Sequence, residues 1–175
     1  MPFEEILGLP AHPLLVHAAV VLVPLLALVG VVYGLIPPLR RKLDLLLVGL
    51  ALVAPAAVYA ARESGEAFRT RLAGKDQMPA ELAAKVDTHS GLSEQLWWWV
   101  LALGAVALLL VLADKLLRRR SDGYDEDGDP MRYGGVPRLL ITMLLTLALI
   151  GVAGAAGWYA YRTGHTGSQM VWEGS

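Results

Sequence analysis

Four long stretches of the chain carry no formal charge, and they constrain its fold more than any other feature. They run from Leu14 to Leu35, Leu45 to Ala61, Leu96 to Ala113 and Leu139 to Tyr161. A helix needs about 20 mostly apolar residues to cross a hydrocarbon core of about 30 Å. The sequence therefore predicts an all-α, integral membrane four-helix up-down bundle, with spans at about 14–36, 43–62, 96–117 and 138–161. An even number of spans places both termini on the same side.

The composition agrees with a single transmembrane domain in contact with the lipid bilayer. Of the 175 residues, 55% are hydrophobic, above the 45–50% that is usual for soluble domains. The chain has no cysteine, which excludes disulfides, iron–sulfur clusters, thiolate zinc sites and covalently attached haem. A formal net charge of −1 gives no attraction to nucleic acid.

The connections between the spans predict an orientation. Lysine and arginine number 9 in the two short connections, at 40–42 and 115–138, and 6 in the rest of the chain. Short loops rich in these residues stay in the cytoplasm. We therefore expect a multi-pass protein of the cytoplasmic (inner) membrane with extracytoplasmic termini and an extracytoplasmic connection over 63–95. The connection over 118–137 is expected to be a flexible acidic segment in the cytoplasm. The chain from Pro79 onwards is expected to be helical, although Gly91 disfavours a continuous helix into the third span.

The histidines are the candidate functional residues. His12 and His17 begin the first span, His89 precedes the third and His165 follows the fourth, so all four share one side of the predicted bundle. Glu66 lies just past the second span on that side. Histidines and carboxylates from several helices are the groups with which helix bundles build metal sites.

His17 is expected to be the principal ligand, because it lies deepest in its span. An ionisable residue inside a membrane helix normally faces the bundle interior and has a partner, for which His89 or His165 is the natural choice. Five residues of helix separate His17 from His12 by about 140° around the axis, so the two do not share one metal easily. His12, His89 and His165 each have a simpler explanation as helix-end or solvated residues.

Several segments resemble one family of bacterial membrane proteins, the domain of unknown function 2231. These segments are "HPLLVHAAVVLVPL", "SGEAF", "VDTHSGLSEQ" and "YRTGHTGSQMVW", at 12–25, 64–68, 86–95 and 161–172. The resemblance covers nearly the whole chain apart from the acidic connector. It implies a four-helix integral membrane protein of bacteria and no particular activity.

The histidines support three hypotheses of function. The first is a b-type haem held by histidines from facing helices, for electron transfer or an accessory role beside respiratory or other membrane-complex subunits. The second is a zinc, copper or iron ion held by the four histidines and Glu66. The third is a non-catalytic scaffold or assembly subunit of a membrane complex. The sequence is also compatible with a homo-oligomer. Enzymatic function is less favoured, because the chain has no nucleophile elbow, zinc-protease helix or phosphate-binding loop.

Overall fold

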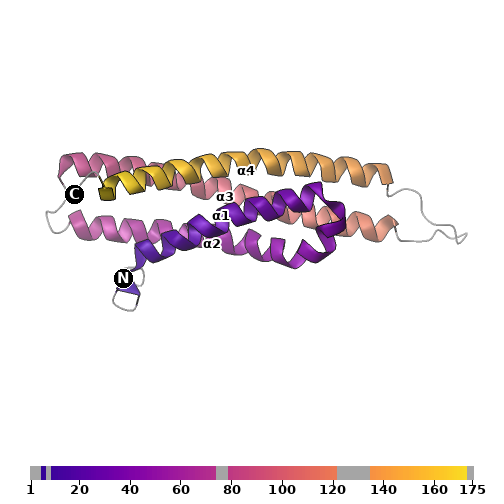
Figure 1. Cartoon of the computed structure of the whole chain (residues 1–175), viewed down its shortest axis with the longest axis horizontal. Coiled ribbons are helices and arrows are strands. Elements are labelled where there is room, and N and C mark those ends of the chain that lie inside the picture. Colours follow the sequence, from indigo (N-terminus) through magenta and orange to yellow (C-terminus); the bar gives the residue numbers. More distant parts are fainter. Residues whose placement is uncertain (1–4, 7–8, 74–78, 122–134, 173–175) are drawn as a thin grey trace, which may run out of the picture.

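The computed structural model describes residues 5–6, 9–73, 79–121 and 135–172. Its elements are β1 Glu5–Ile6, β2 Leu9–Pro10, α1 Ala11–Leu35, the 3₁₀ turn η1 Pro37–Leu39, α2 Arg40–Ala73, α3 Ala80–Ser121 and α4 Gly135–Trp172 (Figure 1). The strands form a short antiparallel pair in which Glu5 lies opposite Pro10. The four long helices confirm the all-α bundle.

Prolines separate α1 from α2. Proline has no backbone N–H, so Pro37 and Pro38 cannot continue the hydrogen bonding of α1. The last α1 bond runs from the Ile36 N–H to the Val32 carbonyl at 2.9 Å. A single 3₁₀ turn then reverses the chain, which makes α1 and α2 an antiparallel hairpin. We call this the turn end of the bundle, and the opposite end, where α1 begins and α4 ends, the terminal end (Figure 1).

The helices pack in a closed ring. Each of α1 and α3 contacts both α2 and α4 extensively, while α1 and α3 barely touch one another and lie on a diagonal. The interior is filled by large apolar side chains, including the fully buried Leu26, Leu47, Leu103 and Leu149. The outward faces are apolar as well, and all four helices are long and apolar enough to cross a membrane. Burial inside and lipid contact outside explain why the helices are hydrophobic all round.

The helices are longer than the predicted spans. α2 continues to Ala73 and α3 begins at Ala80, so most of the predicted connection over 63–95 is helical. The helix expected from Pro79 is confirmed as the start of α3, which passes through Gly91 without a break. One interior glycine costs a helix only about 1 kcal/mol, which packing along a helix of 42 residues outweighs. α3 and α4 also cover 118–121 and 135–137 of the predicted acidic connector, whose remaining residues lie outside the described part of the chain.

The two hairpins, α1–α2 and α3–α4, repeat one pattern of burial. Buried positions of α1 recur in α3 at a spacing of 77 residues, and buried positions of α2 recur in α4 at a spacing of 102. The pairs are Ala19 and Leu96, Val23 and Val100, Leu26 and Leu103, Gly30 and Ala107, Tyr33 and Leu110, and in the other helices Arg40 and Thr142, Leu47 and Leu149, Ala54 and Ala156. The bundle is therefore pseudo-two-fold symmetric about its long axis.

Candidate functional site: a matched pair of histidines

His12 lies at the start of α1 against α2. Its Nδ1 is 3.0 Å from the Ala61 carbonyl oxygen and 3.1 Å from Ser64 Oγ. The Ser64 hydroxyl itself donates to the Ala61 carbonyl at 2.7 Å, so its oxygen is left to accept. Both partners of Nδ1 are thus acceptors, and Nδ1 carries the proton. The other ring nitrogen, Nε2, then has the lone pair that a metal needs.

Gly65 allows this close approach. A Cβ atom at Gly65 would lie 3.0 Å from Cε1 and 3.3 Å from Nδ1 of His12. The imidazole therefore lies directly on the backbone of α2, where a larger residue would push it away. The segment from Ala61 to Gly65 supplies a carbonyl, a hydroxyl and a surface for one ring.

His89 has the same environment in the other hairpin. Its Nδ1 is 3.1 Å from Thr166 Oγ1 in α4. Thr166 Oγ1 donates to the Thr163 carbonyl at 3.1 Å, as Ser64 does to Ala61. A Cβ at Gly167 would lie 3.3 Å from His89 Cε1. Its Nδ1 therefore also donates, and Nε2 carries the lone pair.

The two half-sites occupy equivalent positions of the repeat. His12 and His89 are 77 residues apart, and the segments "ARESG" at 61–65 and "TGHTG" at 163–167 are 102 residues apart. These are the spacings that relate the buried positions of the two hairpins. The two imidazoles come from the diagonal helices and lie near enough to interact electrostatically. We call His12 and His89 the histidine pair.

The structure does not bring the other two histidines to this pair. His17 is exposed on the outer surface of α1, and its Nδ1 donates to the Pro13 carbonyl one turn back, at 2.5 Å. His165 is exposed and stacks on Tyr161, with ring centroids 5.8 Å apart. The expected inward orientation of His17 is therefore not found, and its hydrogen-bond partner lies in its own helix.

The predicted carboxylate also lies apart from the pair. Glu66 is exposed and forms an ion pair with Arg69 at 3.8 Å, and Arg69 also binds Asp87 of α3. Within the described residues, no three histidine, aspartate or glutamate side chains gather as they do around a metal ion.

Aromatic side chains lie beneath the histidine pair. Tyr59 and Trp97 are 5.7 Å apart between ring centroids, and Trp99 stacks on Tyr159 at 6.4 Å. Tryptophan and tyrosine are enriched where the hydrocarbon meets the headgroups. His89 precedes Trp97 by eight residues of helix, or about 12 Å, so the pair lies on the aqueous side of this belt.

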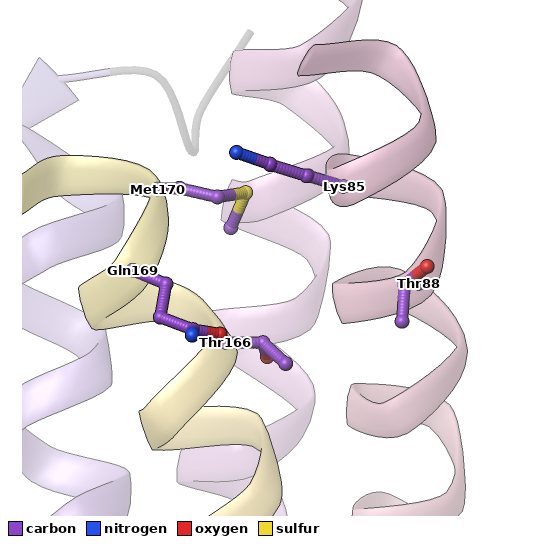
Figure 2. A pocket seen from close by; sticks show the side chains of 5 residues that line it. All are labelled: Lys85, Thr88, Thr166, Gln169 and Met170. Carbon is purple, nitrogen blue, oxygen red and sulfur yellow. The ribbon is translucent and has the colours of Figure 1, made fainter. Parts of the chain in front are cut away.

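A small cavity adjoins His89 between α3 and α4. It has a volume of about 160 Å³ and is lined by Lys85, Thr88, Thr166, Gln169 and Met170. Figure 2 shows the Lys85 side chain extending from α3 towards Met170 of α4, above Thr166. Thr166 both lines this cavity and bonds to His89, so the cavity lies beside one of the two imidazoles.

A second polar cluster lies at the turn end and was not predicted from the sequence. Asp114 of α3 is completely buried and accepts hydrogen bonds from three guanidinium groups. Arg40 Nη1 lies at 3.1 Å and Arg138 Nη2 at 2.9 Å, and Arg118 is the third donor. The cluster ties α2 and α4 to α3.

Arg40 also closes the end of α1. Its Nε donates to the Tyr33 carbonyl at 3.0 Å and its Nη2 to the Gly34 carbonyl at 2.9 Å. These carbonyls are in the last turn of α1, where no intrahelical donor follows and the helix dipole favours a cation. The Tyr33 hydroxyl donates to Asp44 at 2.8 Å. The contacts of Arg40 and Asp114 thus join the ends of the helices at the turn end of the bundle.

Sequence reasoning missed the residues that hold the histidine pair. Ser64, Gly65, Thr166 and Gly167 have no unusual chemistry, and none was proposed as a site residue. The signal that identifies them is the internal match between "ARESG" and "TGHTG" at the ends of equivalent helices.

The chain was compared with protein families, curated proteins and solved structures. No curated protein and no solved structure matches it. One family model, described as "Predicted membrane protein (DUF2231)", matches residues 8–175. The match includes all four helices and both halves of the histidine pair. The chain therefore belongs to the DUF2231 family of predicted membrane proteins.

Proposed function

We propose that the protein binds one b-type haem through Nε2 of His12 and Nε2 of His89, and that it transfers electrons at the membrane surface. The observation that carries this proposal is the duplicated support of the two rings. Each Nδ1 is hydrogen-bonded to a hydroxyl of the neighbouring helix, and each ring lies against a glycine of that helix. Histidines that bind a metal are usually oriented in this way, through the nitrogen that does not touch the metal.

The number of protein ligands favours haem over a bare metal ion. A structural zinc ion takes four protein ligands and a catalytic one takes three. The porphyrin supplies four nitrogens of its own, so haem iron takes two axial ligands from the protein at most. His12 and His89, one from each hairpin, would supply these two ligands through Nε2. Once bound, such an iron accepts and donates one electron at a time.

Haem binding requires the hairpins to move apart. The cavity beside His89 measures about 160 Å³, below the roughly 300–1,000 Å³ of pockets that enclose a drug-sized ligand. The contacts between the hairpins, α1 with α4 and α2 with α3, are less extensive than those within each hairpin. We expect the histidine pair to open by a small separation of the two hairpins at the terminal end.

The position of the pair relative to the membrane suits exchange of electrons with an extracytoplasmic partner. The charge bias of the short connections places the terminal end outside the cytoplasm of a bacterial inner membrane. The pair then lies just beyond the outer aromatic belt. A respiratory complex or a soluble redox protein on that side is the kind of partner that such a site would serve.

The test is a titration of the purified full-length protein with haemin, followed by reduction with dithionite. The wild type is expected to bind one equivalent with the spectrum of a bis-imidazole b-type haem. His12→Ala and His89→Ala should each lose most of the binding. His17→Ala and His165→Ala are matched controls at exposed positions and should bind as the wild type does.

Two outcomes would contradict the proposal. Equal binding by His12→Ala, His89→Ala and the wild type would remove the histidine pair as the site. If haemin does not bind but stoichiometric zinc or copper does, and is lost in the same two variants, the pair holds a metal ion instead. Circular dichroism and gel filtration of each variant show whether a loss reflects unfolding.

A further inference from the structure

A groove on the outer surface lies between α1 and α2, far from the histidine pair. It has a volume of about 550 Å³ and lies towards the turn end. Its lining is apolar except for one lysine: Leu22, Lys42, Leu45, Leu46, Gly49, Leu50 and Val53. All but the first belong to α2.

The groove exists because α2 has a glycine at its centre. Lys42, Leu45, Leu46, Gly49 and Val53 follow the spacing of three and four residues that defines one helix face. A Cβ at Gly49 would meet nothing within 4 Å, so the space above this part of the groove lining is open. Leu45 remains 84% exposed, which shows that no other part of the described chain covers this face.

The groove has the length and polarity of a phospholipid. From Lys42 to Val53 is 11 residues, or about 16 Å of helix. One leaflet contributes about 15 Å, half of a hydrocarbon core of about 30 Å. The cation marks the end of the groove at the membrane boundary, where a headgroup phosphate would lie, and the apolar part extends to the middle of the bilayer.

We propose that this groove is a binding site for an anionic phospholipid of the leaflet at the turn end. The ammonium group of Lys42 binds the headgroup phosphate, and one acyl chain lies along Leu45, Gly49 and Val53. The hollow at Gly49 accommodates the chain, whose methylenes pack against the larger side chains on either side of the glycine.

The pseudo-symmetry of the bundle provides an internal comparison. Gly151 of α4 is the equivalent of Gly49, and a Cβ there also meets nothing within 4 Å. The equivalent of Lys42 is Leu144, so that face has no cation for a headgroup. The site is therefore expected once per chain, on α1–α2 and not on α3–α4.

The experiment measures lipid binding to the full-length protein by native mass spectrometry, with phosphatidylglycerol and phosphatidylcholine as probes. Gly49→Leu fills the hollow and should lower the affinity for phosphatidylglycerol at least tenfold. Gly151→Leu makes the same change at the equivalent position and should leave the affinity unchanged. Equal effects of the two variants would overturn the proposal.

A second pair of variants tests the headgroup. Lys42→Gln should reduce the preference for phosphatidylglycerol over phosphatidylcholine about fivefold, as expected for one cation near an anionic lipid surface. Arg41→Gln removes a neighbouring exposed cation that does not line the groove, and should change the preference little. If both changes act alike, the effect is general surface charge and the site is refuted. If Gly49→Leu alters the oligomeric mass and not the lipid bound, the groove is an interface between chains.

Discussion

At the scale of single residues, the histidine pair depends on side chains that orient it. Ser64 and Thr166 accept the Nδ1 protons of His12 and His89 and thereby leave Nε2 free for a ligand. The Ala61 carbonyl strengthens this arrangement at His12. The opposite helix of each hairpin thus sets which ring nitrogen carries the proton.

We expect Ser64→Ala and Thr166→Ala each to weaken haem binding about 10- to 100-fold, the usual effect of removing a group that orients a metal ligand. Titration with haemin measures the change. Thr70→Ala is the control, because its hydroxyl bonds only to the Glu66 carbonyl of its own helix and is exposed. A loss in Thr70→Ala as large as in the other two would contradict the orienting role.

Single residues also show why the sequence favours His17 as the principal ligand. Depth along the helix is readable from sequence, and His17 is deeper than His12. The direction in which each side chain points around the helix cannot be read from the sequence. Nearly every side chain of α1 is apolar, so no polar stripe distinguishes the outer face from the inner one. Only packing shows that His12 is in phase with Ala19, Val23 and Leu26, which face the core.

At the scale of elements, the turn end is held by one buried carboxylate. Asp114 is the common acceptor of arginines from α2, α3 and α4. If Asp114 were replaced, Arg40, Arg118 and Arg138 would each lose this acceptor. A buried ion pair contributes little in itself, but its disruption leaves charges uncompensated.

Asp114→Ala should therefore lower the free energy of unfolding by about 3–5 kcal/mol, the cost of breaking a buried pair by removing one partner. Thermal unfolding in detergent measures the change. Glu81→Ala removes an exposed partner of Lys85 one turn away, and such pairs contribute about 0.3–0.5 kcal/mol. Similar effects of the two substitutions would show that Asp114 does not stabilise the turn end of the bundle.

At the scale of the whole molecule, the distribution of lysine and arginine predicts the orientation in the membrane. We expect the terminal end to face outwards. The chain has no native cysteine, so single-cysteine variants are read without background. In intact cells, a membrane-impermeant maleimide should label Ser168→Cys, which is exposed in α4 near the terminal end. Arg41→Cys, exposed at the turn end, should be labelled only after lysis. The reverse pattern would invert the orientation.

The sequence by itself determined the class of fold, the number of spans and the gathering of all four histidines at one end. These follow from uncharged length and from the alternation of direction in successive spans, which need no knowledge of contacts. Only the tertiary structure decided which histidines form hydrogen bonds with a neighbouring helix. That choice depends on the rotation of each helix about its axis, which a uniformly apolar helix does not encode in its periodicity. It also depends on glycines such as Gly65 and Gly167, whose role appears only when an imidazole from another helix lies against them.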